Sequence, residues 1–325
     1  MKAVVCRTLG EPEALVVEQV PDPPMGTTQV RIAVHACGIN FADTLLIAGK
    51  YQLKPMPPFI PGMEVAGEVL ECGQEVRRCQ AGDRVLATPD YGGFAEQTVV
   101  SEADTFVIPD NMDAASAAAF PVTYGTSHVA LQWRALLRSG EVLVVHGAAG
   151  GAGLSAVEIG KAMGAEVIAT AGGSEKLAVA AAHGANHLVD SRAEDVKERI
   201  RSLTRARGAD VVYDPVGGDV FDASLRSIAW GGRILLIGFA SGRVPQIPAN
   251  IVMVKNVSII GVHWGSYRSH DPGVLADSFA QLFTWYRDGL LKPHVAETYP
   301  LEGAGMALRA LLDRKTAGKL VLVTR

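Results

Sequence analysis

The chain contains, at residues 141–170, the stretch EVLVVHGAAGGAGLSAVEIGKAMGAEVIAT. A short apolar strand is followed there by a glycine-rich turn, a helix and a second apolar run. This order is typical of a unit that holds a pyrophosphate at a helix start, where exposed backbone N–H groups favour negative charge. Gly150 would let the backbone approach the phosphates and Gly153 would let the helix pack closely on the strand, although Ala148 replaces the first glycine of the usual pattern. A loop that merely needs positive φ angles is the alternative interpretation.

Further apolar runs follow at helix-length intervals and favour the pyrophosphate-binding interpretation. They read VIAT (167–170), HLVD (187–190), DVVYD (210–214), RILLIG (233–238) and VSIIG (257–261). Strands that alternate with helices in this way predict a doubly wound parallel sheet, the Rossmann type of α/β fold.

The end of the second strand carries information about the bound nucleotide. An Asp or Glu that accepts the ribose hydroxyl of NAD normally stands there, whereas this chain has Ala171, Gly172 and Gly173. Lys176 follows within one turn, and Ser191 and Arg192 follow the third strand, so a 2′-phosphate has partners. The sequence therefore predicts NADPH rather than NADH. The alternative is that Lys176, beside Glu175, and Arg192 are ordinary solvated charges.

Composition fits a two-domain enzyme without a nucleic-acid or membrane partner. The 325 residues are 48% hydrophobic and carry a formal net charge of −4. The start MKAVVCRTLG has no signal-peptide core and no run is long enough for a membrane span, so the cytoplasm is the expected compartment. Four scattered cysteines, Cys6, Cys37, Cys72 and Cys79, are expected to be reduced and structural.

The first 110 residues differ from the middle of the chain. Alternating strands such as QVRIAVHACG (29–38) and EVAGEVLECG (64–73), with proline-rich turns, predict a β-barrel-like domain. A helical stretch from Met112 to Leu137 is expected to lead into the nucleotide-binding domain. We expect a catalytic domain of residues 1–120 that is completed by 265–325, and a Rossmann domain of residues 121–264.

Several motifs together resemble the medium-chain dehydrogenase/reductase superfamily, and within it the zinc-independent, zeta-crystallin-like quinone oxidoreductases. They are HACGINFADT (35–44), IPGMEVAGEV (60–69), AGDRV (81–85), GGFAEQ (92–97), the loop HGAAGGAG, YDPVGG (213–218), GGRILLIG (231–238) and GKLVL (318–322). The resemblance covers essentially the whole chain. It implies an N-terminal chaperonin-10-like β-barrel catalytic domain with an inserted Rossmann domain.

Zinc dehydrogenases of this superfamily place a cysteine ligand and a histidine ligand where this chain has Asn40 and Met63. An amide and a thioether are unusual ligands for catalytic Zn²⁺, and Glu64 alone could not hold the ion. We therefore expect no metal. Without a Lewis acid an alcohol is hard to ionise, but a quinone or an α,β-unsaturated carbonyl is already electrophilic. The site need only align such an acceptor, exclude water and donate hydrogen bonds to the developing oxyanion.

The resemblance also points to residues near the nicotinamide. Asn40, Asp43 and Tyr51 are the expected catalytic residues, with orienting and proton-relay roles. Tyr51 is either a proton donor or a packing lid, and Asn40 is alternatively a turn residue. Expected cofactor contacts, many of them through the backbone, are Asn40, Thr126, Ala149, Gly150, Gly151, Ala152, Gly172, Lys176, Ser191, Arg192, Gly217, Gly238, Phe239, His263 and Trp264. His263 is equally interpreted as a surface histidine, and Trp264 and Tyr267 are expected to line the substrate site. Leu45 replaces an aromatic residue that is frequent in relatives.

The functional hypothesis is an NADPH-dependent, metal-free reductase of a quinone or another soft electrophile, acting in the cleft between the two domains. One alternative is an enone or enoyl-thioester reductase, and another is a non-catalytic NADPH-binding sensor or structural protein. The resemblance implies a homodimer, and the apolar run VSIIGVHW (257–264) would be its edge strand.

Overall fold

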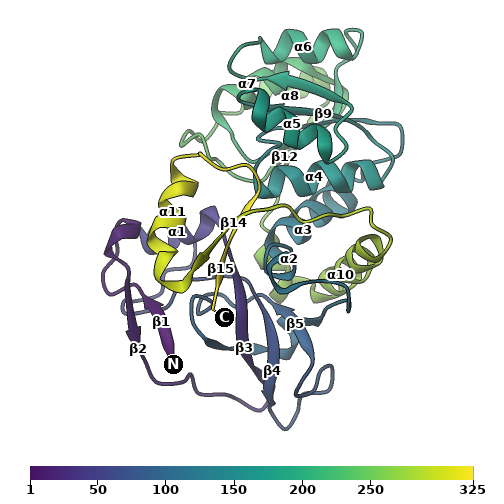
Figure 1. Ribbon diagram of the computed structural model, residues 1–325. Coiled ribbons are helices and arrows are strands. Elements are labelled where there is room, and N and C mark those ends of the chain that lie inside the picture. Colours follow the sequence, from purple (N-terminus) through teal and green to yellow (C-terminus); the bar gives the residue numbers. More distant parts are fainter. Residues whose placement is uncertain (325) are drawn as a thin grey trace. The chain divides into compact units, whose positions relative to one another are not determined.

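The computed structural model describes residues 1–324. They form two compact units, one of Met1–Val122 together with the chain from Pro293 onward, and one of Thr123–Lys292. Each unit has its own sheet (Figure 1).

The second unit contains a six-stranded sheet in the order β10-β9-β8-β11-β12-β13, with every neighbouring pair parallel. Its strands are β8 (Val142–Val145), β9 (Glu166–Ala171), β10 (His187–Asp190), β11 (Ala209–Asp214), β12 (Ile228–Leu236) and β13 (Ser258–Gly261). From β8 the chain adds β9 and β10 on one side, and it then crosses back to add β11, β12 and β13 on the other side. This is the doubly wound order that the alternating apolar runs predicted, so the Rossmann expectation is confirmed.

Helices cover both faces of this sheet because alternate strand residues point to opposite sides. Val144 and Val212 belong to a core with α6 (Val196–Leu203) and α7 (Gly218–Ser227). On the other face α4 (Gly151–Ala162) lies so close to the sheet that a Cβ on Gly160 would come within 2.5 Å of Leu143. Figure 1 shows α4 and α5 (Ser174–Ala182) beside the strands of this unit. The remaining helices of the unit are α3 (Pro121–His128), the π-helical segment Val129–Arg134, α8 (Ala249–Lys255), α9 (Tyr267–His270) and α10 (Pro272–Arg287).

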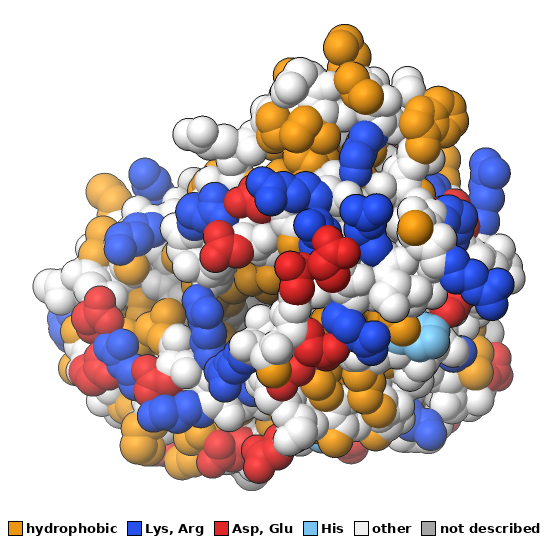
Figure 2. Space-filling view, turned by 90° about the horizontal axis from the view of Figure 1, so that it is seen from above, with side chains coloured by type: hydrophobic (Ala, Val, Ile, Leu, Met, Phe, Trp, Pro, Cys, Tyr) orange, Lys and Arg blue, Asp and Glu red, His pale blue; other side chains and the backbone are white. Residues whose placement is uncertain are grey.

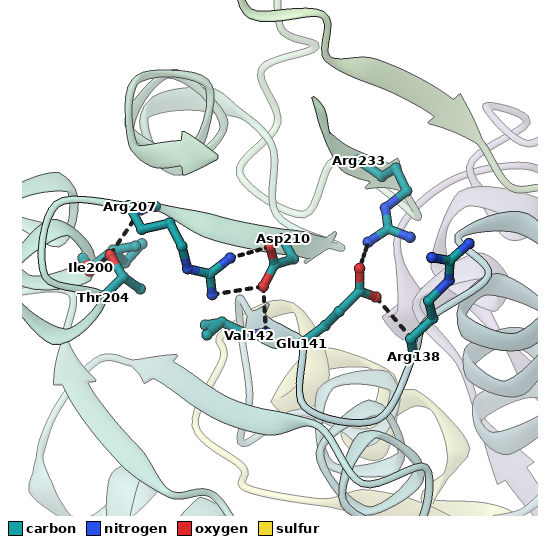
Figure 3. Close-up of polar contacts among 9 residues, drawn as sticks. Arg138, Glu141, Val142, Ile200, Thr204, Arg207, Asp210 and Arg233 are labelled. Carbon is teal, nitrogen blue, oxygen red and sulfur yellow. Dashed lines mark hydrogen bonds and ion pairs between the residues drawn. The ribbon is translucent and has the colours of Figure 1, made fainter. Parts of the chain in front are cut away.

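Charged side chains fix the amino-terminal edge of the sheet (Figure 3). Arg207 pairs with Asp210 at the start of β11, and Asp210 Oδ2 accepts the backbone N–H of Val142 on β8 at 2.8 Å. Arg233 on β12 donates to Glu141 Oε1 at 2.5 Å. These contacts join the three central strands at the edge opposite the glycine-rich loop, which leaves the carboxyl edge free for a ligand.

The first unit contains a mainly antiparallel sheet in the order β14-β15-β3-β4-β5-β7, with β6 also pairing β3. Its strands are β3 (Gln29–Ile39), β4 (Val65–Cys72), β5 (Arg84–Ala87), β6 (Gln97–Ser101), β7 (Thr105–Val107), β14 (Val295–Pro300) and β15 (Lys319–Val323). A separate antiparallel pair is formed by β1 (Lys2–Val5) and β2 (Val16–Gln19). The helices are α1 (Phe41–Ile47), α2 (Ala114–Ala118) and α11 (Ala304–Leu312), besides short 3₁₀ turns. Inward residues such as Ile32, Val65, Val85 and Leu322 form one buried core.

The stretch from Met112 to Leu137, expected to be helical, is divided in the structure. The structure has α2, a break at Ala119 and Phe120, then α3, which passes into a π-helical segment that ends at Arg134. Pro121 explains the break, since proline cannot donate a backbone hydrogen bond and disfavours helical backbone in the residue before it.

The chain returns to the first unit later than the sequence predicted. Residues 265–292 group with the second unit, where Leu275, Phe279 and Leu282 of α10 are buried. Two contacts join α10 to His128 at the end of α3: His128 Nδ1 lies 2.9 Å from Ser278 Oγ, and the rings of His128 and Trp285 meet edge-on. A boundary at 292/293 therefore replaces the expected one at 264/265.

Candidate functional site

The glycine-rich loop has the geometry of an open helix start. Gly150 has φ −81° and caps α4, and the first intrahelical bond runs from the N–H of Leu154 to its carbonyl. The N–H groups of the turn between them are therefore available to a ligand, as at other helix N-termini. Gly150 and Gly153 differ sharply in the space around them. A Cβ on Gly150 would meet only Gly147 O, at 3.4 Å, whereas a Cβ on Gly153 would lie 2.2 Å from that oxygen.

The ends of β9 and β10 are joined by one carboxylate. Asp190 Oδ1 accepts the N–H of Gly173 at 3.1 Å and that of Arg192 at 2.9 Å. These hydrogen bonds, the one from the Arg192 N–H most strongly, lower the pKa of Asp190. The guanidinium arm of Arg192 consequently crosses the end of β9, because a Cβ on Gly172 would come within 2.6 Å of Arg192 Nε. The structure thus brings Gly172 and Arg192 together, next to exposed Ser191 and the first turn of α5 with Lys176.

The loops after the other strands lie at the same carboxyl edge. Asp214 ends β11, and its Oδ1 accepts the N–H groups of Val216 and Gly217, both at 2.8 Å. Gly217 adopts φ 68° and ψ −157°, a conformation that only glycine occupies readily. Gly238 and the half-exposed Phe239 follow β12, and His263 follows β13 with its Nδ1 2.5 Å from Ser266 Oγ. Strand ends from all six strands therefore contribute expected contact residues to one edge.

Trp264, an expected cofactor contact that is also expected to line the substrate site, is a buried residue. Only 7% of it is exposed, and a Cβ on Gly125 of α3 would lie 2.8 Å from its indole. It also meets Phe279 edge-on at 6.4 Å between ring centroids. The Trp264 side chain therefore packs the loop after β13 against α3. Half-buried Thr126 also lies on α3.

In the first unit, Asn40 and Asp43 lie at the start of α1. Asp43 Oδ2 accepts the backbone N–H of Asn40 at 2.8 Å, which is a capping-box contact. Asp43 is fully buried, and this burial raises its pKa to about 7, although the Asn40 N–H and the Lys319 ammonium act in the opposite direction. Tyr51 lies a few residues beyond α1 and packs, partly buried, against the core of the unit.

Comparison with known proteins supports the assignment of the fold. The family model described as alcohol dehydrogenase GroES-like domain matches residues 26–110, and that described as zinc-binding dehydrogenase matches residues 151–281. A quinone oxidoreductase-like protein 2 homolog of Nematostella vectensis is 42% identical over the whole chain and 89% of its own length.

Solved structures agree with the sequence matches. A Pseudomonas syringae quinone oxidoreductase is 34% identical, with 99% of each chain covered and a TM-score of 0.93. An Escherichia coli quinone oxidoreductase solved with NADPH is 29% identical, with both chains fully covered and a TM-score of 0.91.

The chain belongs to the quinone oxidoreductase family of the medium-chain dehydrogenase/reductase superfamily. The β-rich unit is thereby confirmed as the GroES-like domain of this fold and the parallel sheet as its Rossmann domain.

Zinc, which the name of one family model implies, does not fit the residues at the expected position. Glu64 Oε1 accepts from Asn40 Nδ2 at 2.7 Å and from Lys319 Nζ at 2.6 Å, and Glu64 Oε2 accepts the N–H of Val122 at 2.8 Å. A divalent cation there would meet an ammonium group and lack a thiolate or imidazole. Within residues 1–324 no cluster of three His, Cys, Asp or Glu side chains has metal-binding geometry.

Three polar residues near the candidate site were not predicted from the sequence: Lys319, Asp190 and Asp214. Lys319 was visible only as the lysine that opens the apolar run KLVLV, and nothing in the sequence placed it beside Asn40. Asp190 and Asp214 each end a predicted strand, which was the available signal for their roles in shaping the strand-end loops.

One face of the described surface carries charges of both signs. On the face drawn in Figure 2, basic and acidic side chains alternate and no broad field of one sign forms. None of the helices within residues 1–324 is both long and apolar enough to cross a membrane.

Proposed function

We propose that the protein is an NADPH-dependent reductase that transfers reducing equivalents to a quinone without zinc. The carboxyl edge of the parallel sheet supports the proposal that the protein binds NADPH. It combines an open helix start at Gly150 with a glycine-lined end of β9. The family membership supports the acceptor class, since the P. syringae and E. coli neighbours are named quinone oxidoreductases.

The choice of NADPH over NADH rests on Arg192. Its side chain lies against Gly172 at the place where an NAD-specific protein has a carboxylate for the ribose hydroxyls. A guanidinium there suits a 2′-phosphate, and Ser191 and Lys176 add a hydroxyl and a second cation. The E. coli neighbour solved with NADPH is consistent with this assignment.

We assign acceptor orientation and proton delivery to Asn40, Asp43 and Tyr51. When bound, NADPH supplies the reducing equivalents. Formation of a hydroquinone oxygen also requires a proton, and a carboxyl group with a pKa of about 7 can hold one at neutral pH and release it. The amide N–H groups of Asn40 suit an oxygen on which negative charge develops.

An enone or enoyl-thioester reductase is the second candidate, because the same donor and the same proton source would serve it. The two are separated by anaerobic NADPH oxidation with a panel of quinones, enals, enones and enoyl thioesters. We expect the highest kcat/KM with quinones. A strong preference for enones or thioesters would move the assignment to double-bond reduction, and tight NADPH binding without any turnover would favour a sensor or structural role.

We also propose a homodimer joined through β13, in the cytoplasm. β13 ends the sheet with Ile259 and Ile260 only half buried. The preceding α8 exposes Met253 and Val254, each 71% exposed. Unpaired apolar edge strands of this kind favour pairing across a two-fold axis. Four free thiols, with Cys6 and Cys37 buried, suit a reducing compartment.

A further inference from the structure

A lysine and a glutamate are buried together inside the first unit. Lys319 opens β15 and is 5% exposed, whereas Glu64 immediately precedes β4 and is fully buried. Their Nζ and Oε1 atoms lie 2.6 Å apart. Buried charges are costly unless they are paired and hydrogen-bonded, so each of these residues depends on the other.

Both charged groups contact the side-chain amide of Asn40. Lys319 Nζ lies 2.5 Å from Asn40 Oδ1, and Asn40 Nδ2 lies 2.7 Å from Glu64 Oε1. An ammonium group only donates and a carboxylate only accepts. The oxygen of the amide must therefore face Lys319 and its nitrogen must face Glu64, so that rotation of the amide by 180° would place like groups against each other at both contacts.

The surroundings hold Glu64 in place. Its Oε2 accepts the N–H of Val122 at 2.8 Å, and its carbonyl oxygen lies 2.9 Å from Cys37 Sγ. A Cβ on Gly38 would come within 2.3 Å of Glu64 Oε1, so only glycine fits beside the carboxylate. Glu64 is thus a fixed acceptor rather than a mobile one.

The side-chain amide of Asn40 has one further N–H group besides the one that contacts Glu64. Asn40 Nδ2 carries two hydrogens, and the contacts within the described residues use one of them, on Glu64. The second N–H is therefore an oriented donor on a residue that retains 7% exposure.

We propose that Lys319 and Glu64 are positioning residues of the reductase site, which fix the Asn40 amide so that its second N–H donates to the carbonyl oxygen of the acceptor. This inference rests on the proposed function. The charges act only through Asn40: Lys319 selects the amide oxygen, Glu64 selects the amide nitrogen, and together they leave a single donor for the oxygen that gains negative charge.

The test is a double-mutant cycle between the charge pair and Asn40. Lys319→Met with Glu64→Gln removes both charges at similar volume and avoids an unpaired buried ion, and Asn40→Ala removes the donor. We expect either change alone to lower kcat/KM for a quinone about 10- to 100-fold, because one oriented donor to an oxyanion contributes on the order of 10²-fold or more. The variant that combines the charge-pair substitutions with Asn40→Ala should lose little more kcat/KM than either variant alone, since both changes remove the same interaction.

The readouts separate positioning from general damage. The Kd for NADPH, measured by titration without acceptor, should stay within about twofold of wild type. The control is Lys2→Met with Glu302→Gln, the same substitutions at an exposed ion pair of 2.8 Å in the same unit, and it should leave kcat/KM unchanged. If the buried double variant does not fold, Glu64→Gln alone replaces it in the cycle.

Two results would overturn the inference while leaving the proposed function intact: unchanged kcat/KM in the charge-pair variant, or losses that multiply when Asn40→Ala is added. Absence of quinone turnover by the wild-type protein would instead refute the proposed function.

Discussion

At the scale of single residues, two side chains of the candidate site have environments that the sequence did not reveal. Asp43 and Arg192 were both selected as candidates from their motifs and flanking strands. The full burial of Asp43 follows from tertiary packing of α1 on the barrel core, and the approach of Arg192 to Gly172 follows from the Asp190 turn. Residue identity was predictable because it follows motif and strand position, whereas burial and direction depend on parts of the chain far away in sequence.

Asp43→Asn tests the buried carboxyl. The native-state pKa of about 7 lies above the ordinary value of 3.8, so the native protein keeps a proton that the unfolded chain has lost. The stabilisation of wild type relative to the variant should be fully present below about pH 4 and should fall by a few kcal/mol as pH rises through about 7, since one pKa unit corresponds to about 1.36 kcal/mol. Chemical denaturation at a series of pH values measures this difference, and parallel curves for the two proteins would contradict the assignment.

Arg192→Ala tests the choice of cofactor. Loss of a charge-assisted hydrogen bond of about 1.5–3 kcal/mol should weaken NADPH binding at least about tenfold and leave NADH binding within about twofold. Lys176→Ala should act in the same direction. The control is Arg207→Ala at the opposite edge of the sheet, whose partner is Asp210 and which should not change the ratio of the two affinities. Equal weakening of both nucleotides by Arg192→Ala would show that the 2′-phosphate is bound elsewhere.

At the scale of elements, the strands were predicted more accurately than the helices. All six strands of the parallel sheet lie where apolar runs stand in the sequence, because strands buried on both faces need continuous apolar residues. The stretch from Met112 to Leu137 is rich in alanine, and Pro121 divides its helical part into separate helices. The segment that forms α10 was expected to belong to the catalytic domain, and nothing local to it indicated which core it joins.

Two glycines of the loop before α4 provide a matched pair of substitutions. Gly153→Ala would place a Cβ 2.2 Å from a backbone oxygen, so α4 must move away from β8, and overpacking of this kind typically costs about 1–3 kcal/mol or more. Gly150→Ala has room for its Cβ and should keep wild-type stability, yet it should weaken NADPH binding because the Cβ occupies the approach to the pyrophosphate. Thermal denaturation and nucleotide titration of both variants measure these effects. A stable Gly153→Ala protein, or a Gly150→Ala protein with full affinity, would show that the loop does not act as described.

At the scale of the whole molecule, the motifs predicted the family and the two domain types because different motifs lie in every part of the chain. The return point of the chain was misplaced by about one helix, because the apolar side of α10 would suit either core.

The proposed dimer is a prediction at this scale. Ile260→Lys places a charge on the edge strand β13 at a position that does not belong to the buried core against α7. We expect light scattering to give the mass of two chains for wild type and of one chain for the variant, because lysine disfavours edge-to-edge pairing. A wild-type monomer at working concentration would reject the interface.

The most direct test of the account is NADPH oxidation by a quinone after exhaustive chelation, with metal content checked by elemental analysis. Because Lys319 Nζ contacts both Glu64 Oε1 and Asn40 Oδ1, we predict full turnover by the metal-free protein and no gain on adding zinc. Loss of activity on chelation, with recovery when zinc is restored, would contradict a zinc-independent site.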